Sequence, residues 1–143
     1  MATINPYLNY QGNAEEAFKL YKSVFGGEFS SVQRFKDTPE ADKVSAAERD
    51  KIMHIALPVG NGVTLMASDN LESMGHKVSA GNNFSISIIV DSKKEADRVF
   101  EGLSKGGKIE MPLHKEFWGD YFGMFADKFG IRWMVSFPEN RPQ

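Results

Sequence analysis

Residues 13–27 read NAEEAFKLYKSVFGG, and residues 92–107 read SKKEADRVFEGLSKGG. The two segments align at one offset, which places Tyr21 on Phe100 and Gly27 on Gly106 (106 − 27 = 79). In both segments apolar side chains recur every three or four residues and a Gly-Gly pair follows, which is typical of an amphipathic helix and its C-terminal stop. A pattern repeated at a fixed spacing predicts a fold built from two similar halves.

Strand patterns surround both predicted helices in the same order. One apolar strand precedes each helix and three follow it, which predicts two βαβββ modules, at about residues 1–70 and 82–138. The fold class is therefore expected to be α+β with mixed sheets. The expected strands span residues 4–10, 28–35, 52–58, 63–67, 83–90, 108–113, 121–126 and 131–137.

Local signals refine this outline. Gly60-Asn61-Gly62 lies between two apolar runs and predicts a hairpin, because Asn-Gly favours tight two-residue turns. Asn13, with Glu16 three residues later, is the expected N-cap of the first helix. The polar segment 37–50 is expected to be an exposed excursion with one helical turn at about residues 45–50, and the sequence leaves its role open.

The composition suits a single cytoplasmic domain spanning residues 1–143. Hydrophobic residues make up 41% of the chain and charged residues 25%, with a net charge of −2 and no cysteine. Without a clustered basic face we expect no nucleic-acid partner. The lack of cysteine excludes a disulfide framework and any Cys-based metal site. No apolar run reaches the roughly 18 residues of a membrane span, and no signal-peptide pattern is visible.

Alternation along the expected strands selects one sheet face as a candidate binding surface, because neighbouring strand residues point to opposite faces. The first strand would present Leu8 and Tyr10 there. A mostly apolar surface with a few hydroxyls is typical of a small-molecule site, although Tyr10 and the methionines could equally fill space. The substrate-binding candidates on this face are Tyr10, Ser85, Ser87, Met134 and Ser136.

His54 is the best candidate for chemistry. If Ile55 and Leu57 face the helix, His54 faces the candidate surface, where an imidazole can act as a general acid or base near neutral pH. The alternative is a hydrogen-bonded strand histidine without chemistry. Trp118 is a further binding candidate, in a loop that could close over a ligand or pack at a dimer contact, although the favoured interpretation is burial for structure alone. Asp127 is expected to stabilise a turn.

Three segments resemble the vicinal oxygen chelate superfamily, which includes glyoxalase I, bleomycin-resistance proteins and extradiol dioxygenases, and within it the PhnB-like branch. The resemblance implies a glyoxalase-like fold, in which each module forms half of a cupped sheet, and usually a homodimer. Members of the branch often carry a methyltransferase label, which is unsupported here because no Gly-x-Gly loop follows the first strand. The segments are INPYLNYQGNAEEAFKLYKSVFGGE (4–28), MHIALPVGNGVTLMASD (53–69) and FWGDYFGMFADKFGIRWMVSF (117–137).

The resemblance also implies where a divalent metal would bind, through one ligand on the first and one on the last strand of each module. Those positions fall at Pro6, Met66, Ser85 and Met134. Proline has no side-chain donor, neutral serine is a poor ligand, and thioethers suit soft ions such as Cu(I). Residues one position away do not complete a ligand set either. We therefore expect neither a metal nor another cofactor.

Two functions fit these observations. The favoured one is metal-independent binding of a small, partly apolar molecule of unknown identity, as in the resistance-type members of the superfamily. The alternative is an enzyme that uses His54 as general acid or base on a small carbonyl or phosphonate-linked metabolite. Replacing His54 distinguishes the two functions, because only the enzymatic function predicts that the replacement abolishes turnover of a substrate.

Overall fold

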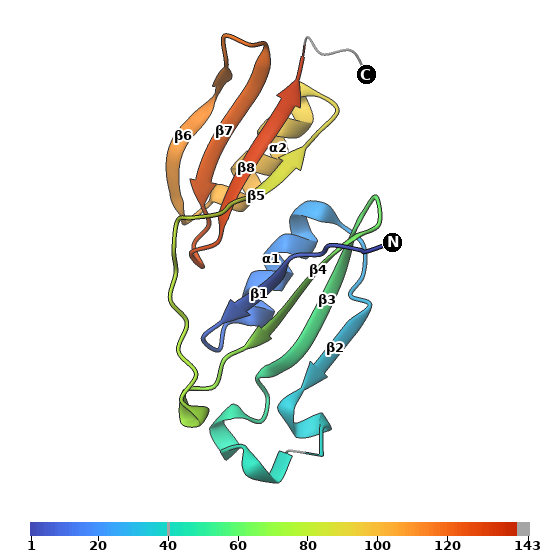
Figure 1. Cartoon of the computed structure of the whole chain (residues 1–143), viewed down its shortest axis with the longest axis vertical. Coiled ribbons are helices and arrows are strands. Elements are labelled where there is room, and N and C mark those ends of the chain that lie inside the picture. Colours follow the sequence, from blue (N-terminus) through green and yellow to red (C-terminus); the bar gives the residue numbers. More distant parts are fainter. Residues whose placement is uncertain (40, 140–143) are drawn as a thin grey trace. The chain divides into compact units, whose positions relative to one another are not determined.

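The computed structural model describes residues 1–39 and 41–139. It divides into two compact units, Met1–Ser79 and Ala80–Gln143, which we call module 1 and module 2. Each contains one βαβββ repeat, with a helix lying across one face of a four-stranded sheet (Figure 1). The predicted α+β fold is thereby confirmed.

Module 1 is a mixed sheet with strand order β1-β4-β3-β2. β1 runs parallel to β4, and the other pairs are antiparallel. Asn61 and Gly62 form the predicted two-residue turn between β3 and β4, with φ angles of 52° and 76°. The elements are β1 (Tyr7–Tyr10), α1 (Ala14–Phe25), β2 (Ser31–Arg34), β3 (Ile52–Gly60) and β4 (Val63–Asp69).

The predicted polar excursion connects β2 to β3 through three short 3-10 turns, Phe35–Asp37, Ala41–Lys43 and Ala46–Glu48. The last of these lies where one helical turn was expected. Glu40, within the excursion, lies outside the described residues.

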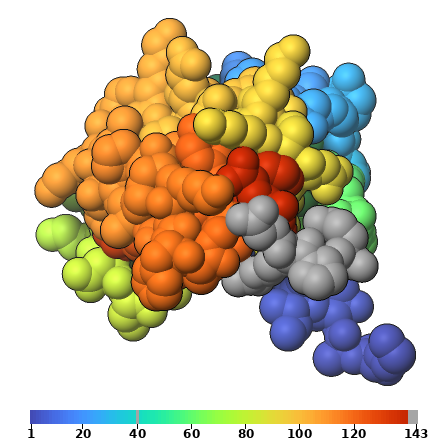
Figure 2. All heavy atoms as spheres, turned by 90° about the horizontal axis from the view of Figure 1, so that it is seen from above, coloured from blue at the N-terminus to red at the C-terminus, as the bar shows by residue number. Residues whose placement is uncertain are grey.

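Module 2 repeats the arrangement with strand order β5-β8-β7-β6, and β5 is parallel to β8. α2 contacts both β6 and β7, and in the space-filling view of Figure 2 the yellow atoms of the β5–α2 region lie beside the orange atoms of these strands. The elements are β5 (Ile86–Ile89), α2 (Lys93–Ser104), β6 (Lys108–Lys115), β7 (Asp120–Ala126) and β8 (Arg132–Pro138).

Each module has its own apolar core between its helix and its sheet. In module 1 the helical spacing buries Phe18 and Tyr21 of α1, and in module 2 it buries Leu103 of α2. Trp133 and Phe125 fill the second core from β8 and β7. No helix in the described part of the chain is both long and apolar enough to cross a bilayer.

Asn13 occupies the predicted N-cap position of the first helix, but its side chain makes no capping hydrogen bond. Asp69, at the end of β4, takes that role: its Oδ1 accepts a hydrogen bond from the Ala14 N–H at 2.9 Å. Its Oδ2 accepts from the Ile52 N–H at 2.8 Å, so one buried carboxylate joins α1 to the start of β3. A partner 55 residues away leaves no local signal at the helix start.

Candidate functional site

Strand register separates the two faces of each sheet, because residues opposite each other on paired strands point to the same side. In module 1 the buried Leu8, Leu65 and Ala67 face α1. We call the opposite surface the helix-free face of module 1. It is formed by Tyr7, Asn9, Ser31, Gln33, His54, Ala56, Pro58, Thr64, Met66 and Ser68.

The predicted placement of Tyr10 on the binding face is wrong. Its side chain is 2% exposed, and its hydroxyl is hydrogen-bonded to that of Tyr21 on α1 at 2.9 Å. The cause is that the segment between the first strand and the helix is one residue longer in module 1 than in module 2. Tyr7, the partner of Met66, lies seven positions before α1 (14 − 7 = 7). Ser87, the partner of Met134, lies only six before α2 (93 − 87 = 6). A one-residue slip reverses every side chain of a strand.

In module 2 the predicted placements agree with the register. Ser87 lies opposite Met134, and Ile89 opposite Ser136, so these residues share the helix-free face of module 2. Ser85 is half-buried and precedes the first residue of β5. The role of these residues in binding stays a prediction.

Tyr7 and His54 form a polar pair on the helix-free face of module 1. The Tyr7 hydroxyl lies 3.3 Å from His54 Nδ1, and the two ring centroids are 5.9 Å apart. Tyr7 is 47% exposed and His54 is half-buried, so both rings are accessible within the module. Ile55 and Leu57 are buried beneath them, as predicted. Sequence reasoning missed Tyr7 because it placed the even-numbered residues of β1, rather than Tyr7 and Asn9, on the helix-free face.

Trp118 lies in an exposed loop between β6 and β7, so the favoured interpretation from the sequence, burial for structure alone, is wrong. Its side chain is 47% exposed and meets the 96% exposed Phe117 edge-on, with ring centroids 4.9 Å apart. His114 lies just before this loop, and its Nε2 is 2.7 Å from Glu116 Oε1. Asp127 has the predicted structural role: it accepts hydrogen bonds from the N–H groups of the following turn and from the Trp133 indole at 2.9 Å.

The register also corrects the positions where the superfamily's metal ligands were expected. On the helix-free faces the partners of Met66 and Met134 are Tyr7 and Ser87, in place of Pro6 and Ser85. The corrected set consists of a phenol, a hydroxyl and two thioethers, which still does not suit a hard or borderline divalent ion. Residues 1–39 and 41–139 contain no grouping of three or more His, Asp or Glu side chains with the geometry of a metal site.

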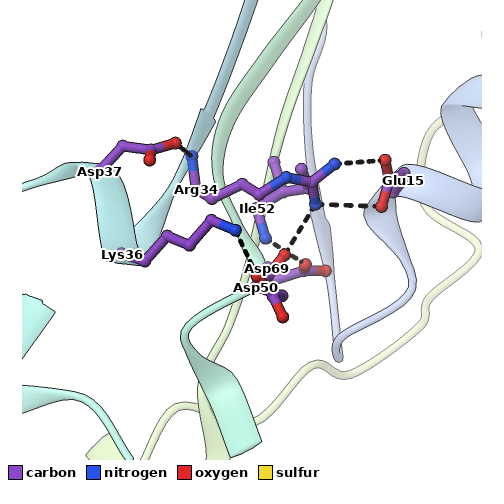
Figure 3. Close-up of polar contacts among 7 residues, drawn as sticks. All are labelled: Glu15, Arg34, Lys36, Asp37, Asp50, Ile52 and Asp69. Carbon is purple, nitrogen blue, oxygen red and sulfur yellow. Dashed lines mark hydrogen bonds and ion pairs between the residues drawn. The ribbon is translucent and has the colours of Figure 1, made fainter. Parts of the chain in front are cut away.

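A polar cavity of about 220 Å³ lies at another place in module 1, beside the start of α1 (Figure 3). Arg34, at the end of β2, forms a bidentate ion pair with Glu15 on α1, with N···O distances of 3.0 and 2.6 Å. Its guanidinium also donates to the Asp50 carbonyl at 2.8 Å. The hydrogen bonds between Arg34 and Glu15 lower the pKa of the Glu15 carboxyl and raise the pKa of the Arg34 guanidinium.

The cavity's charges are largely matched within the protein. Lys36 pairs with the Asp50 carboxylate at 2.8 Å, and Lys51 Nζ donates to the Gly12 carbonyl at 2.9 Å. The network therefore ties the 3-10 excursion and β2 to the start of α1, which is a structural role. Sequence reasoning missed it because ordinary charged residues from three separate segments form it.

Comparisons with known proteins agree with this fold. The family model described as "Glyoxalase/Bleomycin resistance protein/Dioxygenase superfamily" matches residues 3–135. The protein YjdN of Escherichia coli is 29% identical over 144 aligned residues, which cover 97% of each chain. The crystal structure of protein PA1353 from Pseudomonas aeruginosa is 42% identical with a TM-score of 0.85, covering 98% of this chain and all of that one.

A second solved structure bears a more specific name. It is called a putative 3-demethylubiquinone-9 3-methyltransferase, PhnB protein, from Bacillus cereus. It is 27% identical with a TM-score of 0.78, over 95% of this chain and 99% of that one. The likeness is consistent with the PhnB-like branch.

Proposed function

Because this chain belongs to the glyoxalase/bleomycin resistance protein/dioxygenase superfamily, we propose that it binds a small molecule on the helix-free faces of its sheets without a divalent metal. The observation that carries the proposal is the Tyr7–His54 pair, which lies among uncharged polar side chains on a sheet face. Its neighbour Met66 stands where a metal-dependent member would need a harder ligand. In module 2, the proposed contacts are Ser85, Ser87, Met134, Ser136 and Trp118.

A ligand screen on metal-free protein tests this proposal. Protein dialysed against EDTA would be screened by thermal shift with a broad metabolite library, and each hit measured by calorimetry. A true ligand raises the melting temperature by mass action. We expect at least one hit that binds wild type and H76Q equally, but H54Q more weakly. His76 is an exposed loop histidine and so a matched control. A screen without hits, or hits indifferent to H54Q and S87A alike, would contradict the proposal.

A second candidate function is catalysis by His54. In this candidate function the hydrogen bond between the Tyr7 hydroxyl and His54 Nδ1 orients the imidazole, as an orienting group does for a general base. The proposed substrates are small carbonyl or phosphonate-linked metabolites. If the screen yields such a compound, its conversion would be followed by proton or phosphorus NMR. The enzymatic function predicts that H54Q abolishes turnover while its NMR spectrum remains that of a folded protein. Unchanged turnover in H54Q would rule out the enzymatic function.

We do not extend the methyltransferase name of the Bacillus cereus relative to this chain. The link between β1 and α1 reads Gln11-Gly12-Asn13 and lacks the Gly-x-Gly spacing of a nucleotide-binding loop. A homodimer in the cytoplasm belongs to the proposal and is supported by the superfamily resemblance and the cysteine-free composition. Sedimentation at twice the 16.0 kDa chain mass is the expected result, and a monomer would contradict it.

A further inference from the structure

The helix-free face of module 1 differs from the rest of the chain in charge. Lys, Arg, Asp and Glu make up 25% of the chain, yet none occurs among the residues that form this face. Arg34, Glu15 and Asp50, in contrast, line the separate polar cavity, and Figure 3 shows the contacts among them. The one imidazole of the face belongs to His54.

This lack of charge limits what the face can bind. A charged group taken out of water needs an opposite charge or several strong hydrogen bonds, and otherwise pays a large desolvation cost. The face offers amide, hydroxyl and imidazole groups, on Asn9, Gln33, Ser68 and His54, beside the thioether of Met66. Such a surface matches an uncharged molecule that combines polar oxygens with an apolar part.

The Tyr7 contact indicates which atom of His54 a ligand would meet. A neutral imidazole has one donor nitrogen and one acceptor nitrogen. If the Tyr7 hydroxyl donates to Nδ1 across the 3.3 Å contact, the ring proton lies on Nε2. Among the described residues the His54 ring makes no other hydrogen bond, so in that tautomer Nε2–H is left to donate to a ligand.

We propose that the helix-free face of module 1 binds an uncharged ligand through an oxygen atom that accepts a hydrogen bond from His54 Nε2, with Tyr7 as the residue that positions the imidazole. This inference rests on the proposed function and gives the chemical class of its ligand. Carbonyl, amide and hydroxyl compounds fit it, whereas carboxylates and phosphonates do not. Of the two substrate classes named for the second candidate function, this inference therefore selects the carbonyl compounds and argues against the phosphonate-linked ones.

The tautomer of His54 is tested first, in the full chain labelled with 15N at histidine. Long-range proton–nitrogen NMR spectra distinguish a protonated Nε2 from a protonated Nδ1. We expect Nε2–H in wild type and a mixture of tautomers in Y7F, while the exposed His76 is unchanged in both. Y7F removes one exposed hydroxyl, and the same spectra show whether it folds. A protonated Nδ1 in wild type, or an identical tautomer in folded Y7F, would overturn the inference.

Matched neutral and anionic probes then test the ligand class. Benzamide and benzoate have the same shape, so their binding to His54 is compared through the ring resonances between about pH 5.5 and 8.5, where histidines usually titrate. We expect benzamide to bind more tightly than benzoate, with little pH dependence. In Y7F its affinity should fall about twofold, because an even mixture of tautomers halves the population that can donate from Nε2.

The outcomes separate this inference from the proposed function. Preferred binding of benzoate, with affinity that falls as the pH rises, overturns the uncharged ligand but leaves small-molecule binding intact. If neither probe nor any screened compound shifts a resonance of the helix-free face, the proposed function and this inference fall together.

Discussion

Asp69 and Asp127 are both buried, at 4% and 3% exposure, and both carboxylates accept hydrogen bonds from backbone N–H groups. Hydrogen bonds to a charged group stabilise a fold by about 1.5–3 kcal/mol each, more than neutral ones. Asp69 is the more informative of the two, because it joins the first turn of α1 to the first residue of β3.

Replacing Asp69 by Ala should therefore be costly, because it leaves the buried Ala14 and Ile52 N–H groups without an acceptor. We expect a loss of about 2–4 kcal/mol in the free energy of unfolding for D69A. D69N should lose less, because its amide oxygen can still accept one of the two bonds. Urea denaturation followed by circular dichroism measures both. The control is D42A, in an exposed 3-10 turn. Equal stability of D69A and D42A would contradict the role assigned to Asp69.

The contacts of His114 predict that the neighbouring loop, residues 116–119, depends on pH. Its Nδ1 lies 2.8 Å from the Pro112 carbonyl and its Nε2 2.7 Å from Glu116 Oε1. Only the imidazolium can donate from both nitrogens. The two contacts, that of the Pro112 carbonyl foremost, raise the pKa of His114 above its usual 6.5. A raised pKa in the folded state means that the stabilisation is complete below the unfolded pKa and is lost as the pH rises through the folded value.

The loop at residues 116–119 should therefore be held most firmly under mildly acidic conditions. We expect the amide NMR signals of Phe117 and Trp118 to titrate with a midpoint above pH 6.5. The variant H114Q should remove this titration and H76Q should preserve it. A midpoint at or below 6.5, or the same titration in H114Q, would show that His114 does not hold the loop.

At the scale of elements, the helices and the β3–β4 hairpin were predictable because their signals are local. The spacing of Ala17, Phe18 and Tyr21 marks the buried side of α1, and Asn61-Gly62 marks the turn. The facing of β1 was not predictable from alternation alone. It depends on the pairing with β4 and on one extra residue before α1, and both are non-local.

Gly107 lies in the short link between α2 and β6, where we expect a larger side chain to destabilise the fold. A Cβ there would lie 2.2 Å from the Ala126 carbonyl oxygen and 2.9 Å from the Asp127 Cα. Because backbone atoms cannot move aside as a flexible side chain can, G107A should destabilise module 2 by about 1–3 kcal/mol or more, the usual cost of overpacking.

The control for G107A is G81A, at a position with open space. The nearest atom to a Cβ at Gly81 is Asn83 Oδ1 at 3.7 Å, an ordinary contact. Neither glycine has a left-handed φ, so the comparison isolates crowding from backbone strain. Both variants would be measured by chemical denaturation. A G107A variant as stable as G81A would show that the α2–β6 junction tolerates a side chain.

At the scale of the whole molecule, the internal repeat was sufficient to predict the fold class, and the superfamily then follows from residues spread along the chain. The candidate site was predictable only in part. His54, Ser87, Met134 and Ser136 lie on the faces expected, while Tyr7 and the Arg34–Glu15 network were missed. Partners brought together by folding from distant segments, with no distinctive motif, leave no pattern in the sequence.

At this scale we also expect the protein to be independent of divalent metal. The helix-free positions that correspond to the superfamily's ligand positions hold Tyr7, Met66, Ser87 and Met134. Nickel or zinc prefers imidazole, carboxylate or thiolate donors, so neither ion should bind there. Elemental analysis of purified protein should find no stoichiometric divalent metal. Adding either ion should leave the melting temperature unchanged, because a tightly bound ion would raise it. A metal-dependent rise that disappears in H54Q would instead identify His54 as a ligand and overturn the metal-free proposal.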